Sequence, residues 1–160
     1  MATQQAYGNT AMVVGTLALI IGGKNTFGEV DDLKEVVFKQ EDIDGRGTGI
    51  WSPDDFECTI KNLSASHAQS LNSGEPFIAK GSISHNGKNI PYSITVSLEL
   101  HEVGTGIKEG EEAKRTLKGR INTFSEVIGG EQTINYNRDS MHLDFGDGKN
   151  VMENIANNTL

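Results

Sequence analysis

The amino-acid sequence predicts a mainly β protein with antiparallel strands, and three observations support this fold class. Apolar and polar residues alternate with a period of two in many short runs. Turn-forming residues separate these runs, and 19 of the 160 residues are glycine. Hydrophobic residues make up 36% of the chain, which is enough for the modest core of one domain. We therefore expect a single domain over residues 1–160, built from short strands and tight turns.

The clearest predicted strand lies between Pro91 and His101, where one set of alternating side chains is apolar and the other is polar. Such a strand belongs to an antiparallel sheet with one face covered by a core. The apolar set is Ile94, Val96, Leu98 and Leu100, and the polar set is Ser93, Thr95, Ser97 and Glu99. Similar runs occur at 16–21, 33–39, 56–63, 77–85, 113–124, 132–137 and 141–145, with a short strand near 27–30.

Turn and capping residues define the connections. Asn86-Gly87 is typical of a type I′ turn, so the strand at 77–85 should pair with residues 89–101. Residues 64–71 begin with serine, lack β-branched side chains and precede the stop signal Asn72-Ser73-Gly74, which predicts one short helix at 64–72. We expect an N-terminal arm at 1–15 and a C-terminal tail at 146–160. The apolar run at 11–21 predicts a buried strand, because it is too short to span a bilayer and follows no basic residue.

A long loop is predicted at residues 40–55, between two strands. Loops of this length in a compact domain are usually functional. It contains large apolar residues that a fully solvated loop has little reason to keep, which favours a loop that contacts another subunit. The alternative is a hairpin tip that folds back on its own sheet. The candidate contact residues are Glu41, Asp42, Ile43, Asp44, Arg46, Ile50 and Trp51.

Candidate catalytic and metal-binding patterns fail on number or spacing. The four histidines have no paired spacing, and the single cysteine, Cys58, alternates with Phe56 and Ile60, as a buried core thiol would. Asp42-Ile43-Asp44-Gly45 resembles part of a calcium loop, but two required oxygen ligands are missing at the expected offsets. We therefore expect a protein that is not an enzyme and that needs no metal or cofactor.

The chain is acidic, with a net charge of −8, which disfavours ordinary nucleic-acid binding. Acidic residues concentrate between 29 and 57, and basic residues concentrate between 114 and 120. Two interpretations follow: an ordinary solvated surface of mixed sign, or complementary regions that pair across an interface and fix its register.

Five segments, in order, are similar to the major tail tube protein of contractile-tailed bacteriophages. They include a glycine turn followed by Gly28-Glu29-Val30, a glycine-rich segment before a returning strand, and a turn before a strand that crosses the sheet. The resemblance runs from about Leu19 to the C-terminus. The segments are 20–30, 45–61, 76–82, 104–114 and 141–145.

This resemblance implies an antiparallel β-sandwich or partial barrel with a flanking helix, closing into a hexameric ring. Rings would stack, through the long loop and the termini, into a tube inside a contractile sheath. The implied partners are further copies of the chain, the tail sheath protein, the tape measure protein, the baseplate hub and the tail terminator. Double-stranded DNA would pass through without specific binding, and no membrane would be involved. The implied location is the virion tail, after assembly in the host cytoplasm.

Under this reading the lumen wall should be polar and acidic, since such a wall repels phosphates. The candidate lumen residues are Ser93, Thr95, Ser97 and Glu99, with Glu35 and Glu57 as further candidates. Two rival functions remain: the tube protein of a phage-derived injection particle, such as an R-type pyocin or a type VI secretion tube, and a small soluble ligand-binding β-barrel.

Overall fold

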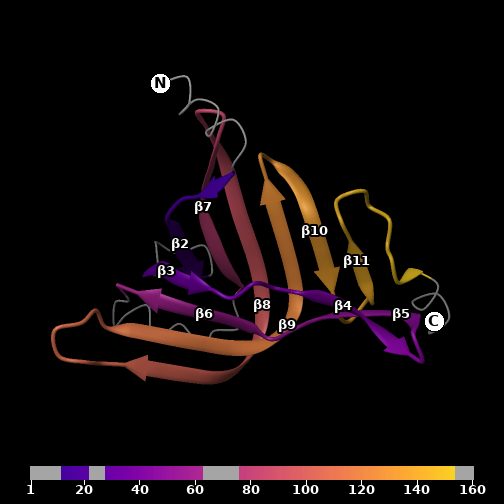
Figure 1. Ribbon diagram of the computed structural model, residues 1–160, viewed down its shortest axis with the longest axis horizontal. Helices are drawn as coiled ribbons and strands as arrows, with labels where there is room; N and C mark the ends of the chain where they lie inside the picture. Colours follow the sequence, from indigo (N-terminus) through magenta and orange to yellow (C-terminus); the bar gives the residue numbers. More distant parts are fainter. Residues whose placement is uncertain (1–11, 22–27, 63–75, 154–160) are drawn as a thin grey trace.

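The computed structural model describes residues 12–21, 28–62 and 76–153, and these contain eleven β-strands (Figure 1). The mainly β, antiparallel fold predicted from the sequence is confirmed. The strands are β1 (Val13–Val14), β2 (Leu17–Ile21), β3 (Gly28–Leu33), β4 (Phe38–Ile43), β5 (Arg46–Pro53), β6 (Phe56–Lys61), β7 (Phe77–His85), β8 (Lys88–Gly106), β9 (Lys114–Ile128), β10 (Glu131–Asn137) and β11 (His142–Asp144).

Six strands close into an antiparallel barrel. Around the barrel, β2 pairs with β3, β3 with β6, β6 with β9, β9 with β8, β8 with β7, and β7 with β2 again. Closure leaves each of these strands with two neighbours over part of its length, which removes most free sheet edges. Outside the barrel, β1 pairs with β7, while β10 and β11 extend the sheet from the second half of β9.

The core fills the barrel and continues under the added strands. On β6 the alternation predicted from the sequence places Phe56, Cys58 and Ile60 inside, and Cys58 is only 2% exposed. The neighbouring strand β9 contributes Ile121 and also Leu117, which lies directly opposite Cys58 in the register. These buried apolar side chains provide the main stabilising contribution to the fold.

Two irregularities bend the long β8–β9 pair. Asn122 on β9 and His101 on β8 each lack a partner on the opposite strand. Extra residues of this kind strengthen the local bend and twist. Between them lies Gly119, where a β-carbon would stand 2.5 Å from the carbonyl oxygen of Glu99. The bend lets the first half of β9 form barrel wall while its second half pairs with β10 (Figure 1).

The Asn86-Gly87 hairpin is confirmed. Both residues have positive φ, 54° and 72°, as a type I′ turn requires. The register runs from His85 opposite Lys88 to Phe77 opposite Val96.

The strand predicted at 33–39 is wrong. Residues 34–37 lie outside any strand and form a linker between β3 and β4. Apolar side chains at this linker pack on a neighbouring sheet: Val36 lines a cavity with Phe124 and Ile134. The ring of Phe38, the first residue of β4, lies 5.6 Å from the ring of Phe124 and 5.5 Å from that of Tyr136. Alternation here therefore reflects packing onto a neighbouring sheet.

The long loop predicted at 40–55 is also corrected, because most of it forms the two-stranded sheet β4–β5 around a turn at Asp44-Gly45. The helix predicted at 64–72 lies outside the described residues, as does most of the arm at 1–15, whose end includes β1. Within the predicted C-terminal tail, Asn150 accepts hydrogen bonds from the backbone N–H groups of Leu143 and Met152, and Met152 is buried in the core.

Candidate functional surfaces

The polar face of β8 adjoins a matching polar face of β9. Thr95 lies opposite Ser125 and Ser97 lies opposite Thr123, which forms a cluster of hydroxyl groups on the outside of the barrel. At the end of this row Arg120 donates a hydrogen bond to the Glu99 carboxylate at 2.6 Å. The charge of Glu99 is therefore balanced within the subunit, and the face is more hydroxyl-rich than acidic.

The structure brings together four of the six candidate lumen residues and separates the other two. Ser93, Thr95, Ser97 and Glu99 alternate along one face of β8. Glu35 lies in the linker on the opposite side of this sheet, beside the inward-facing Ile94. Glu57 lies on the outside of β6, where its carboxylate is 3.9 Å from the Lys34 ammonium. These three positions do not form one continuous acidic wall in the single subunit.

The acidic and basic regions seen in the sequence meet within one subunit. Lys114 on β9 lies 3.0 Å from Asp31, and the hydrogen bond and charge of Asp31 raise the pKa of Lys114. Glu57 lies directly opposite Lys118 on β9. For the part of the acidic region around Asp31 and Glu57, this pairing favours the interpretation as a mixed-sign surface.

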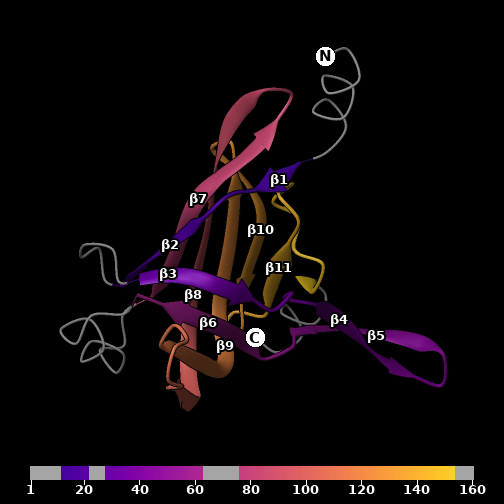
Figure 2. The same ribbon diagram turned by 60° about the vertical axis from the view of Figure 1, so that its left-hand side comes forward.

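The β4–β5 hairpin projects from the barrel (Figures 1 and 2). Its base is fixed because the half-buried Trp51 packs edge-on against Phe145, with ring centroids 6.2 Å apart, and donates its backbone N–H to the sulfur of Met152. Its tip is exposed, and Ile43 is 60% exposed. Of the candidate contact residues, all except Trp51 are exposed; these are Glu41, Asp42, Ile43, Asp44, Arg46 and Ile50.

The second half of β8 presents an open strand edge. Strand β7 covers β8 only as far as Val96. From Ser97 to Gly106, β8 pairs with β9 on one side, and none of the strands in the described residues pairs with its other side. Sequence reasoning missed this edge, since it ended the strand near His101 and expected a turn after it.

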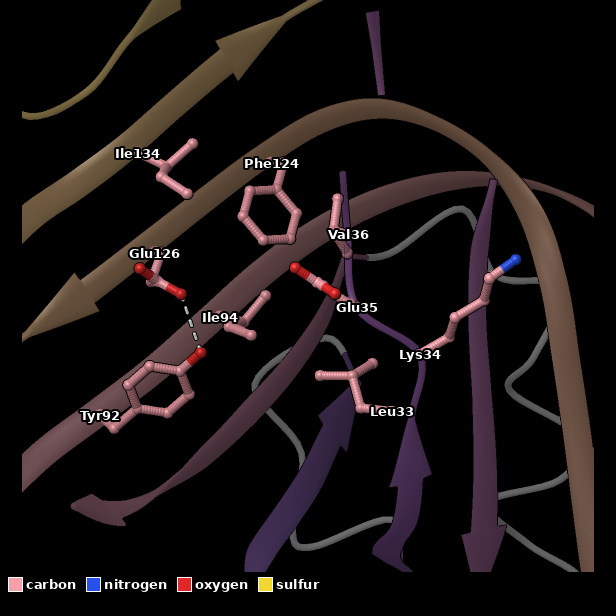
Figure 3. A pocket seen from close by; sticks show the side chains of 9 residues that line it. All are labelled: Leu33, Lys34, Glu35, Val36, Tyr92, Ile94, Phe124, Glu126 and Ile134. Atoms are coloured by element: carbon pink, nitrogen blue, oxygen red, sulfur yellow. Dashed lines mark hydrogen bonds between the residues drawn. The ribbon is translucent and has the colours of Figure 1, made fainter. Parts of the chain in front are cut away.

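A cavity of about 300 Å³ lies between the linker and the inner face of β8, β9 and β10 (Figure 3). Within it the Glu126 carboxylate accepts hydrogen bonds from Tyr92 Oη at 2.9 Å and from Thr133 Oγ1 at 2.7 Å. Burial raises the pKa of the Tyr92 phenol, and the hydrogen bond to Glu126 and its charge raise it further. The cavity is lined by Leu33, Lys34, Glu35, Val36, Tyr92, Ile94, Phe124, Glu126 and Ile134.

A buried carboxylate, Asp144, lies at the end of β11. Burial alone would raise the pKa of Asp144, but hydrogen bonds from His142 and the Gly146 backbone, with a further one from Asn135, lower it overall. These contacts fasten the turn after β11 to the sheet. Across residues 12–21, 28–62 and 76–153, no group of three or more His, Cys, Asp or Glu side chains could hold a metal ion. No helix in this part of the chain is long and apolar enough to cross a membrane.

No protein-family model and no curated protein sequence matches the chain. The structure is similar to that of Hcp1 from Flavobacterium johnsoniae, with 11% identity and a TM-score of 0.56, over 78% of this chain and 100% of that one. Hcp1 from the E. coli EAEC 042 pathovar, solved as a double mutant, matches with 15% identity and a TM-score of 0.49, over 74% of this chain and 96% of that one. A further Hcp protein matches with 5% identity and a TM-score of 0.47, over 69% and 89%. The match to the Flavobacterium protein shows that this chain has an Hcp-like fold.

Proposed function

We propose that this chain is a tube-forming subunit of a contractile injection system and acts as a structural protein. The observation that carries the proposal is the Hcp-like barrel, which spans the whole length of the Flavobacterium Hcp1 chain. Hcp is the tube protein of type VI secretion, and its fold is shared with phage tail tubes. The fold and the ordered sequence segments therefore favour the same class of function by separate routes.

The open edge of β8 supports assembly with further copies. A long unpaired edge exposes backbone N–H and C=O groups that readily pair with another chain. In the proposed ring, the edge from Ser97 to Gly106 is covered by a strand of the neighbouring copy. A head-to-tail contact of this kind closes into a ring when the rotation between copies fits. The proposed ring is a hexamer.

The projecting hairpin supports contact between rings. Its base is anchored to the barrel domain through Trp51, so the direction in which the exposed tip projects is fixed. Ile43 and Ile50 supply exposed apolar area there. In the proposed tube this tip reaches a copy in the adjacent ring, with sheath, tape measure, hub and terminator proteins as the other partners.

The hydroxyl cluster on β8 and β9 is the proposed lumen wall, with Glu99 at its border. Hydroxyl groups and a balanced ion pair offer little to hold passing cargo. The cargo distinguishes two versions of this function. Similarity to Hcp1 favours an injection particle that carries protein, whereas the phage version, with double-stranded DNA as cargo in a virion tail, rests on the sequence resemblance.

Electron microscopy of the purified chain at increasing concentration tests the proposal. We expect rings or tubes of uniform width, together with a blue shift in the emission of the single tryptophan, Trp51, if the hairpin becomes buried. Ile43→Asp should leave rings intact and shorten their stacks, while Val151→Asp, an equivalent change at another exposed apolar residue, should not. A monodisperse monomer at high concentration would contradict the proposed function.

The same particles separate the two versions. Nuclease-protected DNA inside native particles, or capsid and terminase genes beside the gene for this chain, would support the phage tail. Co-purifying protein in the lumen and neighbouring secretion genes would support the injection particle.

A further inference from the structure

The cavity behind the linker combines apolar walls with two carboxylates. Glu126 is half-buried and held in place by Tyr92 and Thr133, so its position is fixed before anything binds. Figure 3 shows the Glu35 carboxylate beside Ile94 and Phe124, with Glu126 on the other side of the cavity. The site therefore presents negative charge from two sides of an apolar hollow.

No cation among the lining residues neutralises these carboxylates. Lys34 lines the cavity, but its side chain extends away from Glu126, and its ammonium lies 3.9 Å from Glu57 (Figure 3). A ligand that suits this site has a cationic head and an apolar body. A guanidinium suits it best, because its planar set of N–H donors can serve two carboxylates at once. A volume of about 300 Å³ is at the small end for ligand pockets and fits one or two side chains.

The tip of the β4–β5 hairpin carries this combination on one face. Ile43 and Arg46 are directly opposite each other in the register, so their side chains lie side by side. Asp42 is paired with Gly47 one position away and therefore points to the other face. Asp44 lies in the turn itself. Arg46 forms no salt bridge with any residue of the described ranges, and both Ile43 and Arg46 are exposed.

We propose that the cavity is a receptor for the hairpin tip of a second copy of this chain. The Arg46 guanidinium of one copy lies between Glu35 and Glu126 of the other, and Ile43 packs on the apolar wall beside it. Charge complementarity selects this occupant, since the two carboxylates and the arginine lack ionic partners in the described part of the single subunit. The inference rests on the proposed tube function and deepens it by naming the site that the hairpin recognises.

A disulfide test detects this contact directly. Ile43→Cys places a thiol beside Arg46 at the exposed hairpin tip, and Val36→Cys places one at the cavity wall. When the two single variants are mixed and mildly oxidised, we expect a crosslinked dimer that contains one of each. Mixing Ile43→Cys with Lys88→Cys, at an exposed turn elsewhere, should give none. The native Cys58 is 2% exposed and should not react.

The outcomes separate this inference from the proposed function. Crosslinked dimers without tubes would support the receptor site and contradict the tube function. Tubes without the crosslink would overturn the receptor site and leave the cavity to another occupant. The absence of both would overturn both.

Charge exchange provides a second, independent measurement. Arg46→Glu and Glu35→Lys should each raise the concentration needed for assembly by about tenfold or more, since losing one partner of a desolvated charge pair typically costs several kcal/mol. Combining the two substitutions in one chain should recover part of this loss, because the exchanged charges at positions 35 and 46 again attract while Glu126 still repels the introduced carboxylate. Lys88→Glu, an equal charge change at the β7–β8 turn, is the matched control. Wild-type assembly by Arg46→Glu, or no rescue in the double variant, would overturn the inference.

Discussion

Alkaline pH should destabilise this fold through Cys58. The thiol is buried in the barrel, and burial together with the negative charge of Asp32 raises its pKa from 9.0 to about 12. The folded state therefore holds the thiol proton more tightly than the unfolded state. The stabilisation that the protonated thiol contributes is fully present below pH 9 and is lost as the pH rises toward 12. Each pH unit in that window costs about 1.4 kcal/mol, so the full loss is on the order of 4 kcal/mol.

Urea unfolding between about pH 8 and pH 11 measures this effect when wild type is compared with Cys58→Ser and Cys58→Ala. Both variants should be less stable than wild type at pH 8, because they disturb a filled core. Above pH 9, wild type alone should lose the thiol contribution, so the difference should shrink by about 1.4 kcal/mol per pH unit. Tyr92 and Tyr136, whose pKa values are raised first of all by burial, titrate in all three proteins and cancel. Parallel pH profiles for the three proteins would refute the reasoning.

Three further changes test how the barrel is held together, each by urea unfolding. Gly119→Ala should cost about 1–3 kcal/mol, since its methyl group would lie 2.5 Å from the Glu99 carbonyl oxygen. Gly104→Ala should be nearly neutral, since its methyl group would make an ordinary contact with Thr116 Cβ at 3.6 Å. Equal stability of these two variants would contradict the close approach. Phe38→Ala should cost about 2–4 kcal/mol by exposing two aromatic rings of the sheet. An unchanged midpoint would show that the start of β4 does not cover that face. Gly87→Ala should cost about 1 kcal/mol because φ at this position is +72°, and Gly87→Asn should recover much of the lost stability. A Gly87→Asn variant no more stable than Gly87→Ala would contradict a type I′ turn.

Local patterns in the sequence predicted the local parts of the fold. The β7–β8 hairpin follows from an Asn-Gly turn between two alternating runs, and its strand bounds at 77–85 agree with the structure. The same chemistry was present at Asp44-Gly45, where both residues have positive φ, 53° and 78°. Reading that pair as a hairpin turn would have replaced the predicted long loop with β4 and β5.

Barrel closure could not be derived in this way. It depends on β2 meeting both β3 and β7, and the contact with β7 joins residues about sixty positions apart, such as Ala18 and Lys80. The linker at 34–37 and the first residue of β4, Phe38, show the same difficulty, because Val36 and Phe38 pack on a sheet formed much later in the chain. Periodicity reports which side chains are buried, but not whether a neighbouring strand or a neighbouring sheet buries them.

The same distinction between local patterns and contacts of distant segments applies to the candidate surfaces. Alternation alone placed Ser93, Thr95, Ser97 and Glu99 on one face of β8. The cavity was not foreseen, because four separate segments line it, around Glu35, Tyr92, Glu126 and Ile134. The chain positions of Glu35 and Glu57 gave no indication that they lie on different sides of the sheet.

The features proposed for assembly lie outside the closed part of the barrel. The six paired strands enclose the core around Cys58. The hairpin tip, the second half of β8 and the cavity lie beyond the part that these strands close. Because the barrel strands satisfy one another, we expect each copy to fold before it meets another. Changes at Ile43 or Arg46 should then weaken assembly while leaving the free energy of unfolding of the single subunit nearly unchanged. Changes at Gly119 should lower the free energy of unfolding and leave the assembly of folded subunits nearly unchanged. If the subunit folded only on assembly, each of these changes would weaken both its stability and its assembly.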